Sequence, residues 1–277
     1  MQILPPHQYL LAIKELNKVS INHYFAKSVL MQNAAGTVYV DDMLQPKCFY
    51  IITNYGMSLI YGSQLTEVTS DFIVTHMQKN TLNTANAEWL QIFPLHWNET
   101  IKQKLGLKLI AADTNEQLTP SSRISKVVEH TRVNFQFDQS LYKSRVENSL
   151  NETFIALSSS QFDDIQGDVT PRHFWKNKAL FDSKGKGICL MKNNEIASVA
   201  FSACIDEDII EIGIETSQAH RHKGYALAAC VQLINYCIDN NITPVWACRQ
   251  GNKASYLLAQ KLGFIPIHYL PYYQLIK

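Results

Sequence analysis

The sequence predicts a mixed α/β fold in which a central sheet is flanked by helices. Short apolar runs separated by turn residues indicate three successive antiparallel strands between residues 188 and 216. Apolar residues at intervals of three and four then mark a core-facing helix. The chain has 277 residues, 46% of them hydrophobic and 18% charged, which is enough to build one large or two medium domains.

The charge balance and the composition exclude several classes of protein. The formal net charge is +1, so the chain lacks the basic excess of a nucleic-acid-binding protein. No stretch approaches the roughly 20 consecutive apolar residues that a membrane-spanning helix requires. Residues 1–6 lack the basic residues and the long apolar run of a secretory signal. We therefore expect a cytoplasmic protein with neither a nucleic acid nor a membrane as partner.

The cysteines follow no disulfide or metal-binding pattern. None of the six belongs to a CxxC pair, and several lie in apolar runs, where a reduced thiol behaves as a small hydrophobic side chain. We expect no disulfide framework and no metal site. A nucleophilic role for Cys248 is not favoured, because its sequence neighbours are apolar.

The first half of the chain carries both helix and strand signals. Tyr9, Ile13 and Leu16 recur at i, i+4 and i+7 with Leu10 on the same face, which predicts a helix from about residue 7 to 19. The predicted strands are 37–40, 49–53 and 57–61, with a hairpin turn at residues 54–56.

A polar stretch at residues 113–122 divides the chain. It contains a proline and no apolar periodicity, which is typical of a loop or linker. We therefore predict an N-terminal α/β domain over residues 1–125 and a second domain over residues 126–277. The N-terminal half could serve as a partner-binding or dimerising domain, and the sequence does not specify an oligomeric state.

The second half has a regular succession of elements. Its three strands are predicted at 188–191, 196–204 and 209–216, with turns at 193–194 and 206–208. A helix follows over residues 224–239, because Leu227, Val231, Ile234 and Ile238 recur on one face. The remaining elements are a strand at 244–248, a helix capped by Asn252 and stopped by Gly263, and a strand near 265–269.

The segment Arg221-His222-Lys223-Gly224-Tyr225-Ala226 lies between the third strand and its helix. Small residues at 224 and 226 let the backbone approach a ligand closely. A helix N-terminus presents unpaired amides and a partial positive charge, so a pyrophosphate is a suitable ligand, and Arg221 and Lys223 would add charge. A glycine at such a turn is also compatible with a tight turn alone.

The ordered set of Arg221-x-x-Gly224-x-Ala226, a helix, a strand, Asn252 and Leu262-Gly-Phe264 resembles the GNAT superfamily of N-acetyltransferases over roughly residues 131–277. The resemblance implies a GNAT fold with an added N-terminal α/β domain, and acetyl-CoA as co-substrate with no metal. It implies that backbone amides of residues 223–226 cradle the pyrophosphate of coenzyme A, that the strand ending at Thr216 lies near the thioester, and that Asn252 touches the pantetheine arm. The implied acetyl-CoA-binding set is Ile214, Thr216, Arg221, His222, Lys223, Gly224, Tyr225, Ala226 and Asn252.

A narrower resemblance covers nearly the whole chain. Gly36-Thr-Val-Tyr-Val-Asp-Asp42, Phe174-Trp175, Glu211-Ile-Gly-Ile-Glu-Thr216 and Pro244-Val-Trp246 are similar to segments of the zwittermicin A resistance protein-like acetyltransferases. This GNAT branch carries an added N-terminal region. The resemblance implies a small-molecule acceptor with a primary amine, such as an aminopolyol antibiotic.

Transfer of an acetyl group to an amine requires a proton acceptor. An ammonium with a pKa of about 10.4 is almost wholly protonated at pH 7, and only the neutral amine attacks a thioester. Alternation in the strand 209–216 places Glu211, Gly213 and Glu215 on one face. We predict Glu211 as the first candidate base and Glu215 as the second. Both carboxylates are also compatible with solvated strand positions or with pairing to a cation.

The group that protonates the leaving thiolate is less defined. GNAT enzymes often have a tyrosine seven residues after the helix-opening asparagine, and that position is Ala259 here. Tyr256 is the alternative candidate acid, although helical geometry turns it about 60° from the Ala259 side. The thiolate, with a pKa near the roughly 8.5 of a cysteine thiol, could also leave without an acid.

Upstream of the three strands, His173, Phe174 and Trp175 would line an acceptor pocket or pack in the core.

The residues and the resemblance together predict an acetyl-CoA-dependent N-acetyltransferase. The acceptor amine would attack the thioester directly in a ternary complex. The alternative is a non-catalytic acyl-CoA-binding module, since the usual tyrosine is replaced by Ala259. Glu211 and Glu215 on one strand face favour the enzyme.

Overall fold

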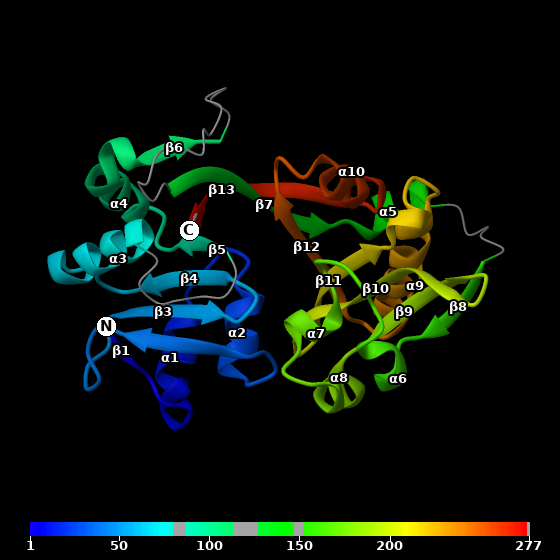
Figure 1. Cartoon of the computed structure of the whole chain (residues 1–277), viewed down its shortest axis with the longest axis horizontal. Helices are drawn as coiled ribbons and strands as arrows, with labels where there is room; N and C mark the ends of the chain where they lie inside the picture. The colour runs from blue at the N-terminus through cyan, green and yellow to red at the C-terminus, as the bar shows by residue number, and fades with distance from the viewer. Residues whose placement is uncertain (80–86, 113–126, 147–151, 276–277) are drawn as a thin grey trace.

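The computed structural model describes residues 1–79, 87–112, 127–146 and 152–275. Their strands form one sheet in the order β1-β2-β3-β4-β5-β13-β7-β12-β11-β10-β9-β8, with β6 paired to β7. Figure 1 shows two halves side by side, joined by the long strands β7 (Val127–Phe137) and β13 (Phe264–Leu275). These two strands pair antiparallel along their length. The predicted linker at residues 113–122 lies outside the described residues.

The first half holds the strands β1 to β6. They are β1 (Gln2–Ile3), β2 (Gly36–Val40), β3 (Cys48–Thr53), β4 (Met57–Gly62), β5 (Glu88–Ile92) and β6 (Leu109–Ala111). The helices are α1 (Tyr9–Leu16), α2 (Tyr24–Leu30), α3 (Glu67–Lys79) and α4 (Trp97–Leu105), with 3-10 turns η1 (Pro6–Gln8) and η2 (Gly106–Lys108).

The second half begins with α5 (Gln139–Arg145), which follows β7. The other strands are β8 (Thr153–Ala156), β9 (Gly187–Lys192), β10 (Glu195–Asp206), β11 (Ile209–Thr216) and β12 (Thr243–Arg249). The other helices are α6 (Ser159–Phe162), α7 (Pro171–Phe174), α8 (Lys178–Lys184), α9 (Tyr225–Asp239) and α10 (Lys253–Lys261), with a 3-10 turn η3 (Gln218–His220).

The two halves repeat one order of elements. In the first, β2, β3 and β4 form an antiparallel meander, and α3 leads to β5, which pairs parallel to β4. In the second, β9, β10 and β11 form the meander, and α9 leads to β12, which pairs parallel to β11.

The connections between the third strand of each meander and the helix that follows it differ between the two halves. Four residues separate β4 from α3, which begins with the acidic Glu67, whereas the longer segment 217–224 separates β11 from α9. An acidic first turn disfavours an anion, so only the second connection suits a phosphate.

The faces of β11 pack against different layers. Ile210 and Ile212 are buried in the core cluster that includes one side of α9, which accounts for the period of two in this strand. Gly213 lies on the other face, where an added Cβ would collide with the ring of Phe201. Phe201 belongs to a separate core cluster beneath α6, α7 and α8. The predicted alternation, with Glu211 and Glu215 opposite the isoleucines, is therefore confirmed.

Most predicted elements are confirmed, and three details are corrected. The first helix is shorter than predicted, because Pro6–Gln8 form a 3-10 turn before α1. Leu10 was wrongly assigned to the buried face, since it is 61% exposed while Ala12 and Leu16 are buried. The last strand, predicted near 265–269, extends to Leu275, because its whole length pairs with β7.

The described cysteines are free and buried, as their apolar neighbours predict. Burial raises the pKa of Cys248, which is consistent with an unreactive thiol. No group of three or more His, Cys, Asp or Glu side chains among the described residues is placed to hold a metal ion. None of the described helices combines the length and apolar character needed to cross a membrane.

Candidate active site

The strands β11 and β12 part in the middle of the second half of the sheet. They pair only from Ile209 opposite Thr243 to Glu211 opposite Val245. Beyond that point β12 pairs on its other side with β7, from Trp246 opposite Phe135 onward. Glu211 therefore lies where the two strands separate, next to backbone groups that carry no β11–β12 ladder. Such an opening can admit an extended ligand between the strands.

The N-terminus of α9 provides an open anion cradle. Gly224 is the N-cap, with a φ of +80°, and no side chain caps this helix end. A Cβ added to Gly224 would have no atom within 4 Å apart from those of its chain neighbours, so the space beside this residue is open. Unpaired amides and the helix dipole attract an anion at such a position.

Cationic side chains flank this cradle. The Arg221 side chain is 56% exposed, its Nε donates to the carbonyl of Thr216 at 3.2 Å, and an Nη lies 3.6 Å from Glu215. Lys223 Nζ donates to the carbonyl of Ala219 at 3.0 Å. His222 is exposed and has a φ of +63°, so it forms part of the tight turn. The segment thus joins two cations to a helix N-terminus, a suitable environment for a pyrophosphate.

The other predicted acetyl-CoA-binding residues lie on β11 and at the N-terminus of α10. Thr216 ends β11, and its hydroxyl lies 2.8 Å from that of Ser198. Ile214 is half-buried against the α9 core. Asn252 is exposed and caps α10, since its Oδ1 accepts from the amide of Ser255 at 3.2 Å. Its predicted role as a cap is confirmed.

Glu211 is buried in a polar cluster between the two halves. Its residue exposure is 8%, and Asn22 Nδ2 donates to Oε1 at 3.0 Å. An Arg132 Nη lies 3.6 Å from the same oxygen. The β10 ladder has a bulge between Ser202 and Cys204, directly opposite Glu211. Bulges are frequent beside active sites, where they redirect a side chain.

The environment of Glu211 opposes ionisation more than it favours it. Burial raises the pKa of Glu211, while the Arg132 charge and hydrogen bonds from Asn22 and Cys204 partly lower it again. A carboxylate with a raised pKa accepts a proton more readily, which suits a general base.

Glu215 is engaged in a structural contact. Its Oε2 accepts from the backbone amides of Asp168 and Val169, both at 3.0 Å. Gly167 has a φ of +132°, and a Cβ there would overlap the Glu215 side chain. The carboxylate thus holds residues 167–169 against the end of β11.

The two positions considered for the general acid face different surroundings. Ala259 is fully buried in the α9 and α10 core. Tyr256 is half-buried, packs edge-on against Phe135, and its hydroxyl lies 2.9 Å from that of Tyr269. This hydrogen bond is the main cause that raises the pKa of Tyr256.

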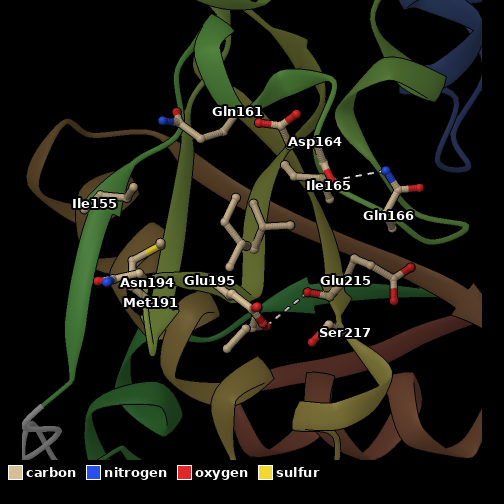
Figure 2. A pocket seen from close by; sticks show the side chains of 14 residues that line it. Ile155, Gln161, Asp164, Ile165, Gln166, Met191, Asn194, Glu195, Glu215 and Ser217 are labelled. Atoms are coloured by element: carbon tan, nitrogen blue, oxygen red, sulfur yellow. Dashed lines mark hydrogen bonds between the residues drawn. The ribbon is translucent and has the colours of Figure 1, made fainter.

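Two pockets are lined in part by residues in or next to the loop that Glu215 holds. The larger, about 470 Å³, is lined by Glu215, Ser217, the β9–β10 hairpin and residues 161–166. Figure 2 shows Glu215 and Ser217 at one end of it and Ile155 and Asn194 at the other. The smaller, about 250 Å³, is lined by Tyr55, Asp168, His173 and Phe174.

The smaller pocket is lined by residues from both halves. The rings of Tyr55 and Phe174 are 4.6 Å apart. Burial raises the pKa of Tyr55, with smaller contributions from Cys204 and Glu211. Of His173, Phe174 and Trp175, which the sequence singled out, His173 and Phe174 line this pocket. Trp175 instead packs in the core and donates to the Ser202 carbonyl at 2.7 Å.

Sequence reasoning missed the residues that surround Glu211. Asn22 and Arg132 come from distant parts of the chain, and Asn134 Oδ1 accepts from the amide of Asn22 at 2.9 Å. One signal was present: His130, Arg132, Asn134 and Gln136 alternate with other residues, so one face of the strand 127–137 is mostly polar, although Arg132 and Asn134 are buried. Buried polar residues at alternate strand positions point to a polar site.

Comparison with known proteins identifies the class that this fold and site define. The sequence profile of the GNAT acetyltransferase family matches residues 15–273. The chain therefore belongs to the GNAT acetyltransferases, enzymes that use acetyl-CoA as co-substrate.

Individual relatives agree with this assignment. A Bacillus subtilis (strain 168) protein described as the uncharacterized N-acetyltransferase YdfB is 26% identical over 257 residues, covering 90% of this chain and 89% of that protein. The crystal structure of a GCN5-related N-acetyltransferase-like protein from Streptococcus suis 89/1591 aligns with a TM-score of 0.69 at 18% identity, covering 98% of this chain and 100% of that one. A tandem GNAT protein from the clavulanic acid biosynthesis pathway aligns with a TM-score of 0.57 at 8% identity, covering 99% and 97%. The two structures establish similarity of fold.

Proposed function

We propose that this GNAT acetyltransferase transfers the acetyl group of acetyl-CoA to a primary amine of a small molecule, with Glu211 as the general base. The position of Glu211 carries the proposal. It lies buried where β11 and β12 separate, on the face that the N-terminal half covers. A base at this point would be close to both an extended donor between the strands and an amine arriving from the other half.

The donor would be held by the second half of the chain. Backbone amides at residues 223–226 would bind the pyrophosphate, with Arg221 and Lys223 supplying charge beside His222 and Tyr225. Ile214 and Thr216 would lie along the pantetheine arm on one side and Asn252 on the other. Acetyl-CoA itself supplies the activated thioester.

The reaction would be a direct displacement in a ternary complex. The neutral amine nitrogen attacks the thioester carbonyl, a carbon–nitrogen bond forms, and the carbon–sulfur bond breaks. Glu211 accepts the proton that the amine loses. Tyr256 remains the candidate that protonates the departing thiolate, from its hydroxyl pair with Tyr269. Glu215 is a second candidate base, and its contacts with Asp168 and Val169 also favour a positioning role for it.

The acceptor would bind at the junction of the two halves. The pocket formed by Tyr55, Asp168, His173 and Phe174 draws on both of them. We propose that the N-terminal domain, residues 1–125, completes the site through Tyr55 and Asn22. The resemblance to zwittermicin A resistance protein-like acetyltransferases adds an aminopolyol antibiotic as one candidate acceptor.

A second candidate function is an acyl-CoA-binding module without catalysis. The observation that favours it is Ala259, buried where GNAT enzymes often carry a tyrosine. Both functions require the cradle at Gly224, but only the enzyme requires Glu211.

One experiment distinguishes the enzyme from the acyl-CoA-binding module. Release of free coenzyme A from acetyl-CoA is followed over a panel of primary amines for the wild type and Glu211→Gln. We expect the substitution to lower kcat by about 10²- to 10⁴-fold, because it removes the proton acceptor while keeping the side-chain shape. Acetyl-CoA affinity should remain unchanged. Binding without amine-dependent turnover in the wild type would favour the module.

A further inference from the structure

Two arginines lie directly opposite each other on the face of the sheet that carries Glu211. Arg249 of β12 and Arg132 of β7 are cross-strand partners in the ladder. Like charges opposite one another in a sheet are destabilising. Val245, the partner of Glu211 across the parallel pair, lies four residues before Arg249, so about 13 Å of strand separates them. Because four positions, an even number, separate Val245 from Arg249, their side chains lie on the same face of the sheet.

Aromatic rings hold both guanidinium groups in place. Arg249 Cζ lies 5.3 Å from the ring centroid of Trp89, and Arg132 Cζ lies 5.4 Å from that of Tyr272. The Trp89 and Tyr272 rings stack on each other at 5.1 Å with an interplanar angle of 28°. Arg249, Trp89, Tyr272 and Arg132 therefore form a continuous column, which ends 3.6 Å from Glu211.

The column carries more positive charge than the protein neutralises. Glu211 is the carboxylate beside Arg132, and within the described part of the chain no carboxylate lies within ion-pair distance of Arg249. Arg132 is 6% exposed, yet its Nε has no hydrogen-bond partner, and neither has Asn134 Nδ2, whose residue is 4% exposed. A buried donor without a partner is costly, and these two lie at the Glu211 end of the column, where an oxygen of the bound acceptor can accept from them.

We propose that Arg249, with Arg132 behind it, recognises an anionic group on the acceptor, so that the enzyme acetylates amines that also carry a carboxylate or a phosphate. Arginine offers a planar fork of donors that matches either anion, and the stacked rings fix its orientation. The anion would bind at the Arg249 end of the column, and the amine would lie at the Glu211 end. This proposal rests on the proposed acetyltransfer for its amine end. It makes an aminopolyol that lacks an acidic group one of the poorer acceptors.

The test uses matched pairs of amines that differ in one charge. One series consists of α-amino acids and of ω-amino acids of increasing chain length, and each compound is compared with its own carboxamide. In addition, O-phosphoethanolamine is compared with ethanolamine. Turnover is measured by coenzyme A release, and binding by calorimetric titration of the protein saturated with coenzyme A. In at least one pair we expect the acidic member to be favoured by about tenfold or more.

Two variants attribute this preference to the column. Arg249→Gln should abolish the preference for the acidic member while leaving acetyl-CoA affinity unchanged. Arg249→Lys should retain part of it, because the charge remains and the fork is lost. Arg145→Gln is the control, since Arg145 contacts the Gln260 carbonyl in the second half, away from the column.

The outcomes separate this proposal from the proposed function. An acidic member that binds better than its amide in the wild type and not in Arg249→Gln supports the anion site, even if no amine is acetylated. If neither turnover nor binding distinguishes the members of any pair, or if Arg249→Gln keeps the preference, the proposal is overturned. Failure to bind acetyl-CoA would instead overturn the proposed acetyltransfer.

Discussion

Asn22 Nδ2 donates a hydrogen bond of 3.0 Å to Glu211 Oε1, across 189 residues of sequence. The contact joins the loop before α2, in the first half, to the strand that carries the candidate base in the second. Lys27 and Asp206 form a second link nearby, an ion pair of 2.7 Å. The N-terminal half therefore helps to set the ionisation of Glu211.

The contact with Asn22 predicts a change in pH dependence. The hydrogen bond lowers the pKa of Glu211, which burial otherwise raises. Asn22→Leu should therefore raise this pKa further, and because the base acts when deprotonated, the acidic limb of kcat should move to higher pH. We expect a shift of about one pH unit, from a hydrogen bond of about 1.4 kcal/mol. Asn17→Leu, an exposed position, is the control, and an unmoved limb in Asn22→Leu would contradict the assignment.

The contacts of Glu215 predict a separate effect on the KM for the acceptor. Its carboxylate accepts from the amides of Asp168 and Val169, and Asp168 lines the smaller pocket. Glu215→Ala should raise the KM for the acceptor, since the pocket wall loses its anchor, and lower stability by about 1–3 kcal/mol. Steady-state kinetics and urea denaturation measure the two effects. A drop in kcat as large as that of Glu211→Gln, with KM unchanged, would instead make Glu215 the base.

Tyr256 gives a test of the general acid. If its hydroxyl protonates the thiolate, Tyr256→Phe should lower kcat by about tenfold or more and leave acetyl-CoA affinity intact. Tyr269→Phe removes the partner hydroxyl at 2.9 Å and should cause a smaller loss. An unchanged kcat in Tyr256→Phe would show that the thiolate leaves without this residue.

The N-terminal half contains a buried polar network away from the site. His76 Nε2 and the Glu88 carboxylate lie 2.8 Å apart, Ser58 donates to Glu88 at 2.5 Å, and Tyr50 also donates to it. All four side chains are fully buried. His76→Ala should lower the free energy of unfolding by about 3–5 kcal/mol, because it leaves one oxygen of the buried Glu88 carboxylate without its hydrogen-bond partner. Ser58→Ala should cost about 1 kcal/mol, and equal losses would contradict this account.

Local patterns predicted most of the second half of the fold. The strand Ile209–Thr216 has the predicted bounds, and the turn at Asn193 and Asn194 has positive φ at both residues, as a tight hairpin requires. The cap at Asn252 and the open glycine at 224 were also predictable, because each depends on a few adjacent residues.

Features that depend on distant residues were not predictable from one sequence. Asn22 and Arg132 reach Glu211 only because β7, β12 and the loop before α2 meet in the folded chain. The strand β7 was not predicted from the sequence, although β13 pairs with it along its whole length. The engagement of Glu215 by the amides of Asp168 and Val169 likewise depends on a loop that local periodicity does not describe.

Calorimetric titration with acetyl-CoA tests the central claim most directly, using the wild type, Gly224→Asp and Gly106→Asp. Gly224 and Gly106 both have positive φ and open space around a would-be Cβ, and the ψ of −130° at Gly106 is less favourable for a side chain than the ψ of 0° at Gly224, so the control carries at least as much backbone strain. Only Gly224→Asp places bulk and negative charge in the proposed phosphate cradle. We predict micromolar binding (on the order of 10⁻⁶ M) by the wild type and by Gly106→Asp, and loss of about 100-fold or more in Gly224→Asp. Equal affinity in all three folded proteins would contradict the assignment of the cradle to acetyl-CoA.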